Sequence, residues 1–304
     1  MCPQKVSEME QQQLRFAIFG NEYQARKATA IQKVLSVLSQ QQAEVYIDRP
    51  FYEFITKDLN LSVEVAGFFD GEQFDADFVI SMGGDGTFLK AASRVGNKCI
   101  PIIGINMGRL GFLADVLPSE AETVLTAICN GDYEIEDHAA IQIDTDGEKL
   151  SGLPWALNDI AILKRDTASM ISIRTTIDDD YLVTYQADGL IVSTPTGSTA
   201  YSLSNGGPVI APQSGNLCLT PVAPHSLNIR PIVISDNSVV TLSVVSRSHN
   251  YLVAIDGRSE SLSETTTVTI RRAPFSIRIV RRRGKRYFST LREKMMWGND
   301  LRNA

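Results

Sequence analysis

Cysteine is scarce in this chain of 304 residues, and its four cysteines, Cys2, Cys99, Cys129 and Cys218, lie far apart. Because no two of them have the short spacing of a metal site, structural zinc is not expected. The cysteines are expected to be reduced thiols. Long apolar runs are also missing. None approaches the ~18 residues that cross a membrane, and residues 1–13 lack the apolar core of a signal peptide. These absences predict a cytoplasmic protein with no membrane partner.

An excess of positive charge is absent as well. Lys and Arg number 29 and Asp and Glu number 35, a net charge of −6 that argues against nucleic acid as a partner. A basic run near the C-terminus alternates with strand-forming residues and is interpreted as a solvated strand face or a subunit contact. Its members are Arg271, Arg272, Arg278, Arg281, Arg282, Arg283, Lys285 and Arg286. At about 150 residues per domain, the length predicts two domains.

The most informative segment is the loop Gly83–Thr87, Gly-Gly-Asp-Gly-Thr, between an apolar run and a helical pattern. Glycines expose backbone N–H groups and a helix start adds partial positive charge, so the loop is expected to bind an anion such as phosphate. A carboxylate at Asp85 would repel phosphate unless it held a metal or accepted a proton from an attacking hydroxyl. Both roles belong to phosphoryl transfer, and the loop therefore suggests a kinase.

Two better-known phosphate loops do not match this segment. A P-loop ends in Gly-Lys-Ser/Thr, whereas Gly86 precedes Thr87 and the first lysine is Lys90. The dinucleotide fingerprint needs a third glycine where this chain has Leu89. A structural alternative is that Asp85 only caps the helix that begins near Thr87.

The first half of the sequence alternates strand and helix patterns. A helix face is expected around residues 31–38, and a second helix is expected to start at Pro118 and Ser119, with Glu122 completing a capping box and Gly131 as its C-terminal glycine. Strands are predicted at 14–19, 44–47, 77–82 and 100–105. This alternation predicts an α/β domain with an open, mostly parallel sheet over residues 1–138.

From about Ala139 the pattern changes to short runs rich in Val, Ile, Thr and Tyr. Such runs occur at 140–144, 171–177, 181–185, 239–245 and 266–270. They predict an all-β, sandwich-like domain over residues 139–288. Helical character returns after about Ser289, so residues 289–304 are expected to pack back on the α/β domain.

One stretch of the β domain, residues 188–204, is dense in hydroxyl groups. Ser and Thr hydroxyls donate and accept, and small residues let backbone amides approach, which suits the ribose, phosphate and base edges of a nucleotide. An ordinary turn cluster would have the same composition. The residues alone leave both interpretations open.

These motifs together resemble the NAD kinase family, in matching order over residues 14–290. The resemblance rests on segments 83–87, 106–112, 158–159, 188–204, 206–208, 224–227 and 230–231. It implies an α/β domain followed by a β-sandwich-like domain with NAD-binding loops, a cleft between the two, and a homo-oligomer such as a dimer or tetramer.

The resemblance implies that the γ-phosphoryl group of ATP moves to the 2′-hydroxyl on the adenosine ribose of NAD, with Mg²⁺ accompanying ATP. Asp85 is the expected catalytic base, amides around Gly84 and Gly86 hold phosphate, and no residue is expected as a dedicated metal ligand. The residues expected at NAD or ATP are Gly83, Gly84, Asp85, Gly86, Thr87, Lys90, Phe112, Asn158, Asp159, Asp188, Thr196, Thr199, Ala200, Tyr201, Ser202, Leu203, Ser204, Ala223 and Arg258.

Two departures from the family pattern affect this expectation. The family usually has Asn-Glu where this chain has Asn158 and Asp159, and Asp-Gly-Gln where it has Asp256, Gly257 and Arg258. Two other classes fit part of the sequence. A lipid kinase of the diacylglycerol type or a sugar kinase could share the glycine loop, and a non-catalytic dinucleotide sensor could share the hydroxyl-rich stretch.

Overall fold

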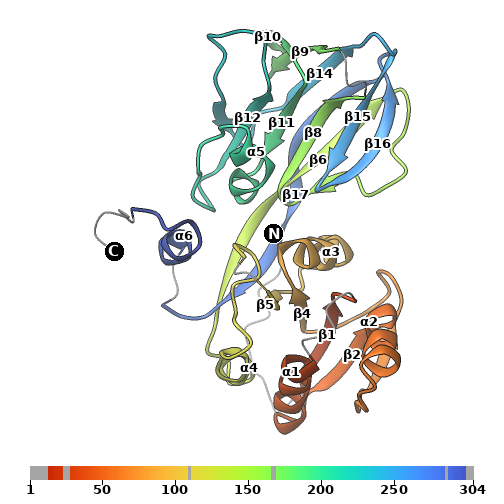
Figure 1. Cartoon of the computed structure of the whole chain (residues 1–304), viewed down its shortest axis with the longest axis vertical. Helices are drawn as coiled ribbons and strands as arrows, with labels where there is room; N and C mark the ends of the chain where they lie inside the picture. Colours follow the sequence, from red (N-terminus) through yellow and green to blue (C-terminus); the bar gives the residue numbers. More distant parts are fainter. Residues whose placement is uncertain (1–12, 23–27, 109–110, 166–168, 285–286, 299–304) are drawn as a thin grey trace. The chain divides into compact units, whose positions relative to one another are not determined.

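The computed structural model describes residues 13–22, 28–108, 111–165, 169–284 and 287–298 (Figure 1). The chain divides into two compact units: Met1–Asp137 with Ile277–Ala304, and His138–Ser276. The return to the first unit precedes the boundary expected near residue 289, because one strand, β17 (Thr267–Arg281), runs on from the second unit into the first.

The first unit is built on a parallel sheet. Its strands are adjacent in the order β3, β2, β1, β4, β5, β17, and each neighbouring pair is parallel. Every residue of β4 and β5 is buried, which explains their continuous apolar sequences. The bounds are β1 (Arg15–Gly20), β2 (Glu44–Asp48), β3 (Gly67–Phe69), β4 (Phe78–Gly83) and β5 (Ile102–Asn106). The expected open, mostly parallel sheet is confirmed.

Helices cover both faces of this sheet. Buried residues of α1 (Ala28–Gln40) and α4 (Ala121–Cys129) share one apolar core with Ile103 and Ile105 of β5. Gly104, between them, faces the other way toward Phe88 of α3 (Asp85–Val95), whose ring would lie 3.0 Å from an added Cβ. The remaining helical segments are α2 (Arg49–Glu53), η2 (Phe54–Asp58), η3 (Gly96–Lys98) and α6 (Tyr287–Met295).

The capping box predicted for α4 is wrong. The N-cap is Glu120, whose own carboxylate accepts the N–H of Leu117 at 3.2 Å, and Glu122 instead pairs with Lys33 of α1 at 3.3 Å. The helix therefore begins after, and not at, the predicted Pro-Ser pair. Its C-terminal signal is confirmed, since Gly131 has a φ of +74° and donates its N–H to the Ile128 carbonyl at 3.0 Å.

The second unit is a β-sandwich. One antiparallel sheet has the order β13, β12, β11, β8, β15, β16, and facing it lie β10, β9, β14 and β17, with β6 and β7 beside β17. The bounds are β6 (Glu134–Asp146), β7 (Trp155–Ala156), β8 (Asp159–Lys164), β9 (Ile171–Ile177), β10 (Asp180–Ala187), β11 (Gly189–Ser193), β12 (Asn216–Val222), β13 (Ile232–Ser235), β14 (Val240–Val245), β15 (Asn250–Ile255) and β16 (Arg258–Ser263), with the short helices η4 (Thr196–Thr199) and α5 (Tyr201–Ser204).

The sandwich core takes buried side chains from both sheets, such as Ile162 and Leu190 from one and Ile173 and Val240 from the other. Burial alternates along β14, as expected for a strand with one face in the core. The predicted sandwich-like β domain is confirmed.

The cysteines depart from expectation at one position. Cys129 and Cys218 are free thiols, but Cys99 is disulfide-bonded, so the expectation of a reduced thiol is wrong there; Cys2 lies outside the described residues. Across the part of the chain that the structure describes, no helix is long and apolar enough to span a membrane.

Candidate active site

The glycine loop has the strand–loop–helix geometry expected from its sequence. Strand β4 ends at Gly83 and α3 begins at Asp85. Gly83 is required by packing, since a Cβ there would lie 2.1 Å from Oγ1 of Thr87. Gly84 and Gly86 differ, because each has open space where a Cβ would stand and neither has a positive φ. These two glycines leave room for a ligand at a helix N-terminus that favours an anion.

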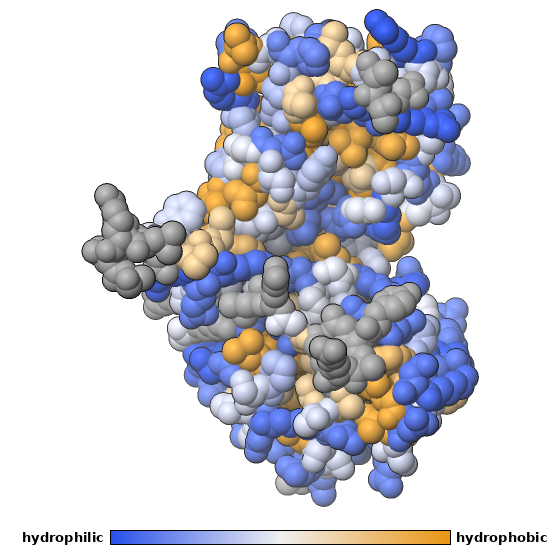
Figure 2. Space-filling model, in the orientation of Figure 1, coloured by the Kyte–Doolittle hydropathy of each residue, from blue (hydrophilic) through white to orange (hydrophobic). Residues whose placement is uncertain are grey.

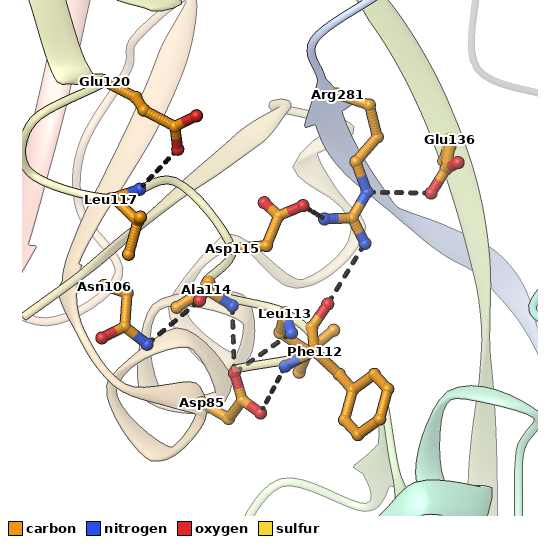
Figure 3. Close-up of polar contacts among 10 residues, drawn as sticks. All are labelled: Asp85, Asn106, Phe112, Leu113, Ala114, Asp115, Leu117, Glu120, Glu136 and Arg281. Atoms are coloured by element: carbon orange, nitrogen blue, oxygen red, sulfur yellow. Dashed lines mark hydrogen bonds and ion pairs between the residues drawn. The ribbon is translucent and has the colours of Figure 1, made fainter. Parts of the chain in front are cut away.

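Asp85 does not cap α3. Gly84 is the N-cap, with no side-chain bond there, and the Asp85 carboxylate reaches another loop. Its Oδ2 accepts the N–H of Phe112 at 3.0 Å, and its Oδ1 accepts those of Leu113 at 3.1 Å and Ala114 at 3.0 Å, as Figure 3 shows. The capping alternative is therefore wrong. The carboxylate fixes the Phe112 loop to the start of α3.

Neighbouring residues leave room for this contact and support it. A Cβ on Gly111 would lie 2.0 Å from Oδ1 of Asp85, so only glycine fits there. The fully buried Asn106 donates its Nδ2 to the Ala114 carbonyl at 3.1 Å (Figure 3). Arg109 and Leu110, between these positions and part of the family-like segment, lie outside the described residues.

Arg281 holds the same loop from its other side. Its guanidinium pairs with Asp115 at 2.9 Å and Glu136 at 2.9 Å, and it donates to the Phe112 carbonyl at 3.4 Å (Figure 3). Burial by itself lowers the pKa of Arg281, but Asp115 and Glu136 outweigh it and raise that pKa. The interpretation of the basic run as a solvated face is wrong at this residue, whose side chain is 11% exposed.

The other described arginines of the basic run are also paired with carboxylates. The pairs are Arg271–Asp144, Arg272–Asp236, Arg278–Asp137, Arg282–Glu120 and Arg283–Asp132. Lys285 and Arg286 lie outside the described residues. Because each of these arginines has an acidic partner, the run does not present a row of free cations.

Lys90 forms an ion pair with a residue outside the glycine loop. It lies on α3, and its ammonium is 3.6 Å from Glu22. Lys90 was expected at NAD or ATP, and the structure gives it an acidic partner that follows β1 in the sequence.

In the second unit, Asp256 holds the loop that carries Asn158 and Asp159. Its Oδ2 accepts the N–H of Leu157 at 2.7 Å, and its Oδ1 accepts those of Asn158 at 2.8 Å and Asp159 at 3.1 Å. Arg258 supports the same turn, with hydrogen bonds to the carbonyls of Ile255 at 3.2 Å and Trp155 at 3.1 Å. Asp256 was not among the expected site residues, and Arg258 contacts backbone here.

The two side chains on this loop are buried and polar. Oδ1 of Asn158 has no hydrogen-bond partner within the described chain. Burial, and then the negative charge of Asp256, raise the pKa of Asp159 to about 7. An unpaired amide oxygen and a carboxyl group that titrates near neutrality are costly to keep in an interior, and both are expected where a ligand completes the hydrogen bonds.

The hydroxyl-rich stretch is packed directly against this loop. Thr194 donates its hydroxyl to the Leu157 carbonyl at 2.6 Å and its N–H to the Asn158 carbonyl at 2.9 Å. A Cβ on Gly197 would lie 2.0 Å from that same Asn158 oxygen. Thr196 bonds the buried His138 at 2.8 Å, a histidine that sequence reasoning passed over. The stretch therefore fixes the Asn158 backbone.

The remaining expected site residues differ in accessibility. Ser202 is fully buried, with its hydroxyl 2.8 Å from that of Thr220, so it supports the loop from inside. Tyr201 is 41% exposed. Thr199, which precedes Ala200, donates its hydroxyl to the Thr196 carbonyl at 3.4 Å. Leu203 is half-buried and Ser204 is exposed. Asp188 pairs with Lys164 at 2.8 Å, and Ala223 has a φ of +43°.

Comparisons with known proteins identify both units. The ATP-NAD kinase N-terminal domain matches residues 16–133, and the ATP-NAD kinase C-terminal domain matches residues 157–282. An NAD kinase of Bacteroides fragilis is 57% identical over 289 residues, covering 95% of this chain and 100% of that protein. An NAD kinase of Porphyromonas gingivalis is 44% identical over 288 residues, covering 95% and 99%.

Two solved structures share the fold. The yeast NADH kinase complexed with NADH aligns with a TM-score of 0.87 at 21% identity, over 97% of this chain and 91% of that one. An NAD kinase from Archaeoglobus fulgidus in complex with ATP aligns with a TM-score of 0.75 at 26% identity, over 93% and 99%.

The fold and the glycine loop define a two-domain kinase. The chain belongs to the NAD kinase family, as the resemblance predicted. Since the match extends over nearly the whole chain, a lipid kinase, a sugar kinase and a non-catalytic sensor are not favoured.

Proposed function

We propose that the chain is an ATP-dependent NAD kinase, which transfers the γ-phosphoryl group of ATP to the 2′-hydroxyl on the adenosine ribose of NAD to give NADP. One observation carries the proposal: the Asp85 carboxylate stands at the N-terminus of α3 between Gly84 and Gly86, which leave open space for phosphate. The family's curated members and both domain matches support the same activity.

In this reaction Asp85 accepts the proton of the 2′-hydroxyl as that oxygen bonds to the γ-phosphorus. The bond from the γ-phosphorus to the bridging oxygen breaks, and ADP leaves. Such transfers demand positioning and charge balance more than strong bases, because the hydroxyl proton is lost late. Backbone N–H groups around Gly84 and Gly86 and the dipole of α3 would hold the phosphate oxygens.

We assign the dinucleotide contacts of the second unit to Asn158, Asp159 and the exposed side of the hydroxyl-rich stretch. The unpaired Oδ1 of Asn158 offers an acceptor to an NAD hydroxyl or amide. The carboxyl group of Asp159 offers a second acceptor once it ionises. Tyr201 and Ser204, both exposed, are proposed to contact NAD from the same stretch.

We propose that Mg²⁺ arrives with ATP and is not a resident ion. Within the described residues no group of three or more His, Cys, Asp or Glu side chains could hold a metal. Asp85, whose oxygens already accept three N–H groups, offers a single carboxylate. A single carboxylate fits an ion that is bound chiefly by substrate phosphates. Such an ion would balance the charge of the phosphates.

We further propose a cytoplasmic homo-oligomer of two or four chains. Large apolar side chains on the second unit support an interface, with Leu227 95% exposed and Val245 67% exposed. Apolar patches interrupt a largely hydrophilic surface in Figure 2. Sedimentation analysis should give a dimer or tetramer, and a fully active monomer would contradict this. Cell fractionation should recover the protein with cytoplasmic markers.

The activity is tested by supplying purified protein with NAD, ATP and Mg²⁺ and measuring NADP with an NADP-specific dehydrogenase. NADP should form, and EDTA should abolish its formation. Turnover that resists EDTA would refute the metal requirement. Failure to phosphorylate NAD with ATP or polyphosphate, combined with phosphorylation of diacylglycerol, would refute the proposed acceptor.

A further inference from the structure

The C-terminal helix α6 brings a lysine to Asp85. Nζ of Lys294 lies 3.4 Å from Oδ2 of Asp85 and 4.2 Å from the centre of the Phe112 ring. Seven residues earlier on the same helix, the Tyr287 ring lies 6.4 Å from the Phe112 ring. Residues seven apart share a helix face, so α6 lays one face along Phe112 and ends with a cation at the Asp85 carboxylate.

Asp85 does not need this cation to satisfy its hydrogen bonds. Both carboxylate oxygens already accept backbone N–H groups from residues 112–114. Lys294 is not locked in an interior either, since its side chain is 30% exposed. Among the described residues Asp85 is its one carboxylate partner, which leaves N–H donors of the ammonium group directed elsewhere. A cation on an aromatic face beside a functional carboxylate is suited to meet an incoming anion.

The glycine loop has no lysine of its own that could play this part. Lys90, the first lysine after the loop, pairs with Glu22 at 3.6 Å. Lys294 is the lysine that contacts Asp85 among the described residues, although it lies 209 positions further along the sequence.

We propose that Lys294 is the phosphate-binding lysine of this kinase, supplied by the C-terminal helix. In the free protein its ammonium group pairs with Asp85. When ATP binds, the ammonium moves to the phosphate oxygens, balances their charge and leaves Oδ2 of Asp85 to accept the 2′-hydroxyl proton. The ammonium group only exchanges one anionic partner for another, so the proton balance of the transfer is unchanged. This inference rests on the proposed kinase function and adds a residue to it.

Three variants test the role: Lys294→Met, Lys294→Arg as the conservative rescue, and Arg292→Met as the matched control. Arg292 is an exposed cation on the same helix. A charged hydrogen bond is worth about 1.5–3 kcal/mol, which is about 10- to 100-fold in affinity. The KM for ATP is expected to rise by about that factor in Lys294→Met, with the KM for NAD changed less than about threefold. Lys294→Arg should recover most of the loss, and Arg292→Met should match wild type.

A second measurement uses inorganic tripolyphosphate and needs no turnover. The compound should raise the melting temperature of wild type and Arg292→Met, and the rise should be lost in Lys294→Met and weakened by salt. Unchanged KM for ATP and unchanged tripolyphosphate stabilisation in Lys294→Met would overturn the proposal. Equal increases in both KM values, with the same loss in Arg292→Met, would show a structural role and overturn it too. Wild type that binds tripolyphosphate through Lys294 yet makes no NADP would uphold the lysine and refute the proposed function.

Discussion

Two aspartates, one in each unit, each hold a loop of their own unit by the same pattern of hydrogen bonds. Asp85 accepts the N–H groups of residues 112–114, and Asp256 accepts those of residues 157–159. In both, the first N–H of the three goes to Oδ2 and the next two go to Oδ1. The neighbours differ. Lys294 lies 3.4 Å from Asp85, whereas the carboxylate whose charge acts on Asp159 is Asp256.

We infer from this difference that the surroundings of the two carboxylates, and not their backbone contacts, give them different roles. The pKa of Asp256 is raised, because burial outweighs the lowering by its three N–H bonds and by Arg258. A partly desolvated carboxylate placed beside another carboxylate is suited to holding a loop in position. Asp85 is 31% exposed and faces a cation, which suits a group that must meet substrate. In the proposed mechanism, the same pattern of hydrogen bonds accompanies chemistry in the first unit and positioning in the second.

The largest expected effect separates the two aspartates by activity. Asp85→Asn removes the proton-accepting charge, and loss of a general base costs about 10²- to 10⁴-fold, so kcat should fall by at least about a hundredfold. NAD affinity should change far less, because the contacts of the second unit remain. Steady-state kinetics and direct NAD binding measure this. Near-normal kcat at an unchanged melting temperature would show that Asp85 only holds the Phe112 loop.

Asp256→Asn makes the same substitution in the other loop and serves as its control. An amide can accept two of the three N–H groups but opposes the third with its own N–H, so the Asn158 loop should shift. A lost hydrogen bond of about 1 kcal/mol corresponds to about a fivefold rise in the KM for NAD, and kcat should stay within about threefold of wild type. A fall in kcat as large as that of Asp85→Asn would remove the distinction between the two aspartates.

Asp159→Asn is expected to leave the chemistry aside and to give a pH-dependent gain in stability. The pKa of Asp159 is about 7 when folded against an ordinary value of 3.8. The folded protein therefore disfavours the ionised form. That cost is absent below about pH 4, grows toward pH 7 and is complete above it. The neutral amide avoids it, so the variant should gain about 1–4 kcal/mol at pH 8.5 and much less at pH 5. Melting curves at both pH values check this, and a gain independent of pH would contradict it.

Sequence could predict what is encoded locally. Strands such as β4 and β5 follow from apolar runs. Asp85 is conspicuous because a carboxylate in a phosphate-binding glycine loop would repel the phosphate unless it had a chemical role. The capping box of α4 failed because Glu120, a residue with no special signal, folds back on Leu117.

Contacts between distant residues could not be predicted in this way. Arg281 and the Phe112 carbonyl are 169 positions apart, and Asp256 and Leu157 are 99 apart. Periodicity reports which face of an element is buried but not which residue lies opposite. The sequence pattern therefore does not distinguish Arg281, which is buried and paired with Asp115, from the exposed arginines beside it.

The division of the first unit between the two ends of the chain bears on its synthesis. Asp85 and Asp115 leave the ribosome before the second unit is made, whereas Arg281 and Lys294 emerge after it. Domains generally begin to fold during synthesis, from the N-terminus onward. Asp115 and Arg281 can pair only once the whole sandwich has been translated. The α/β unit is therefore the first to begin folding and the last to be completed.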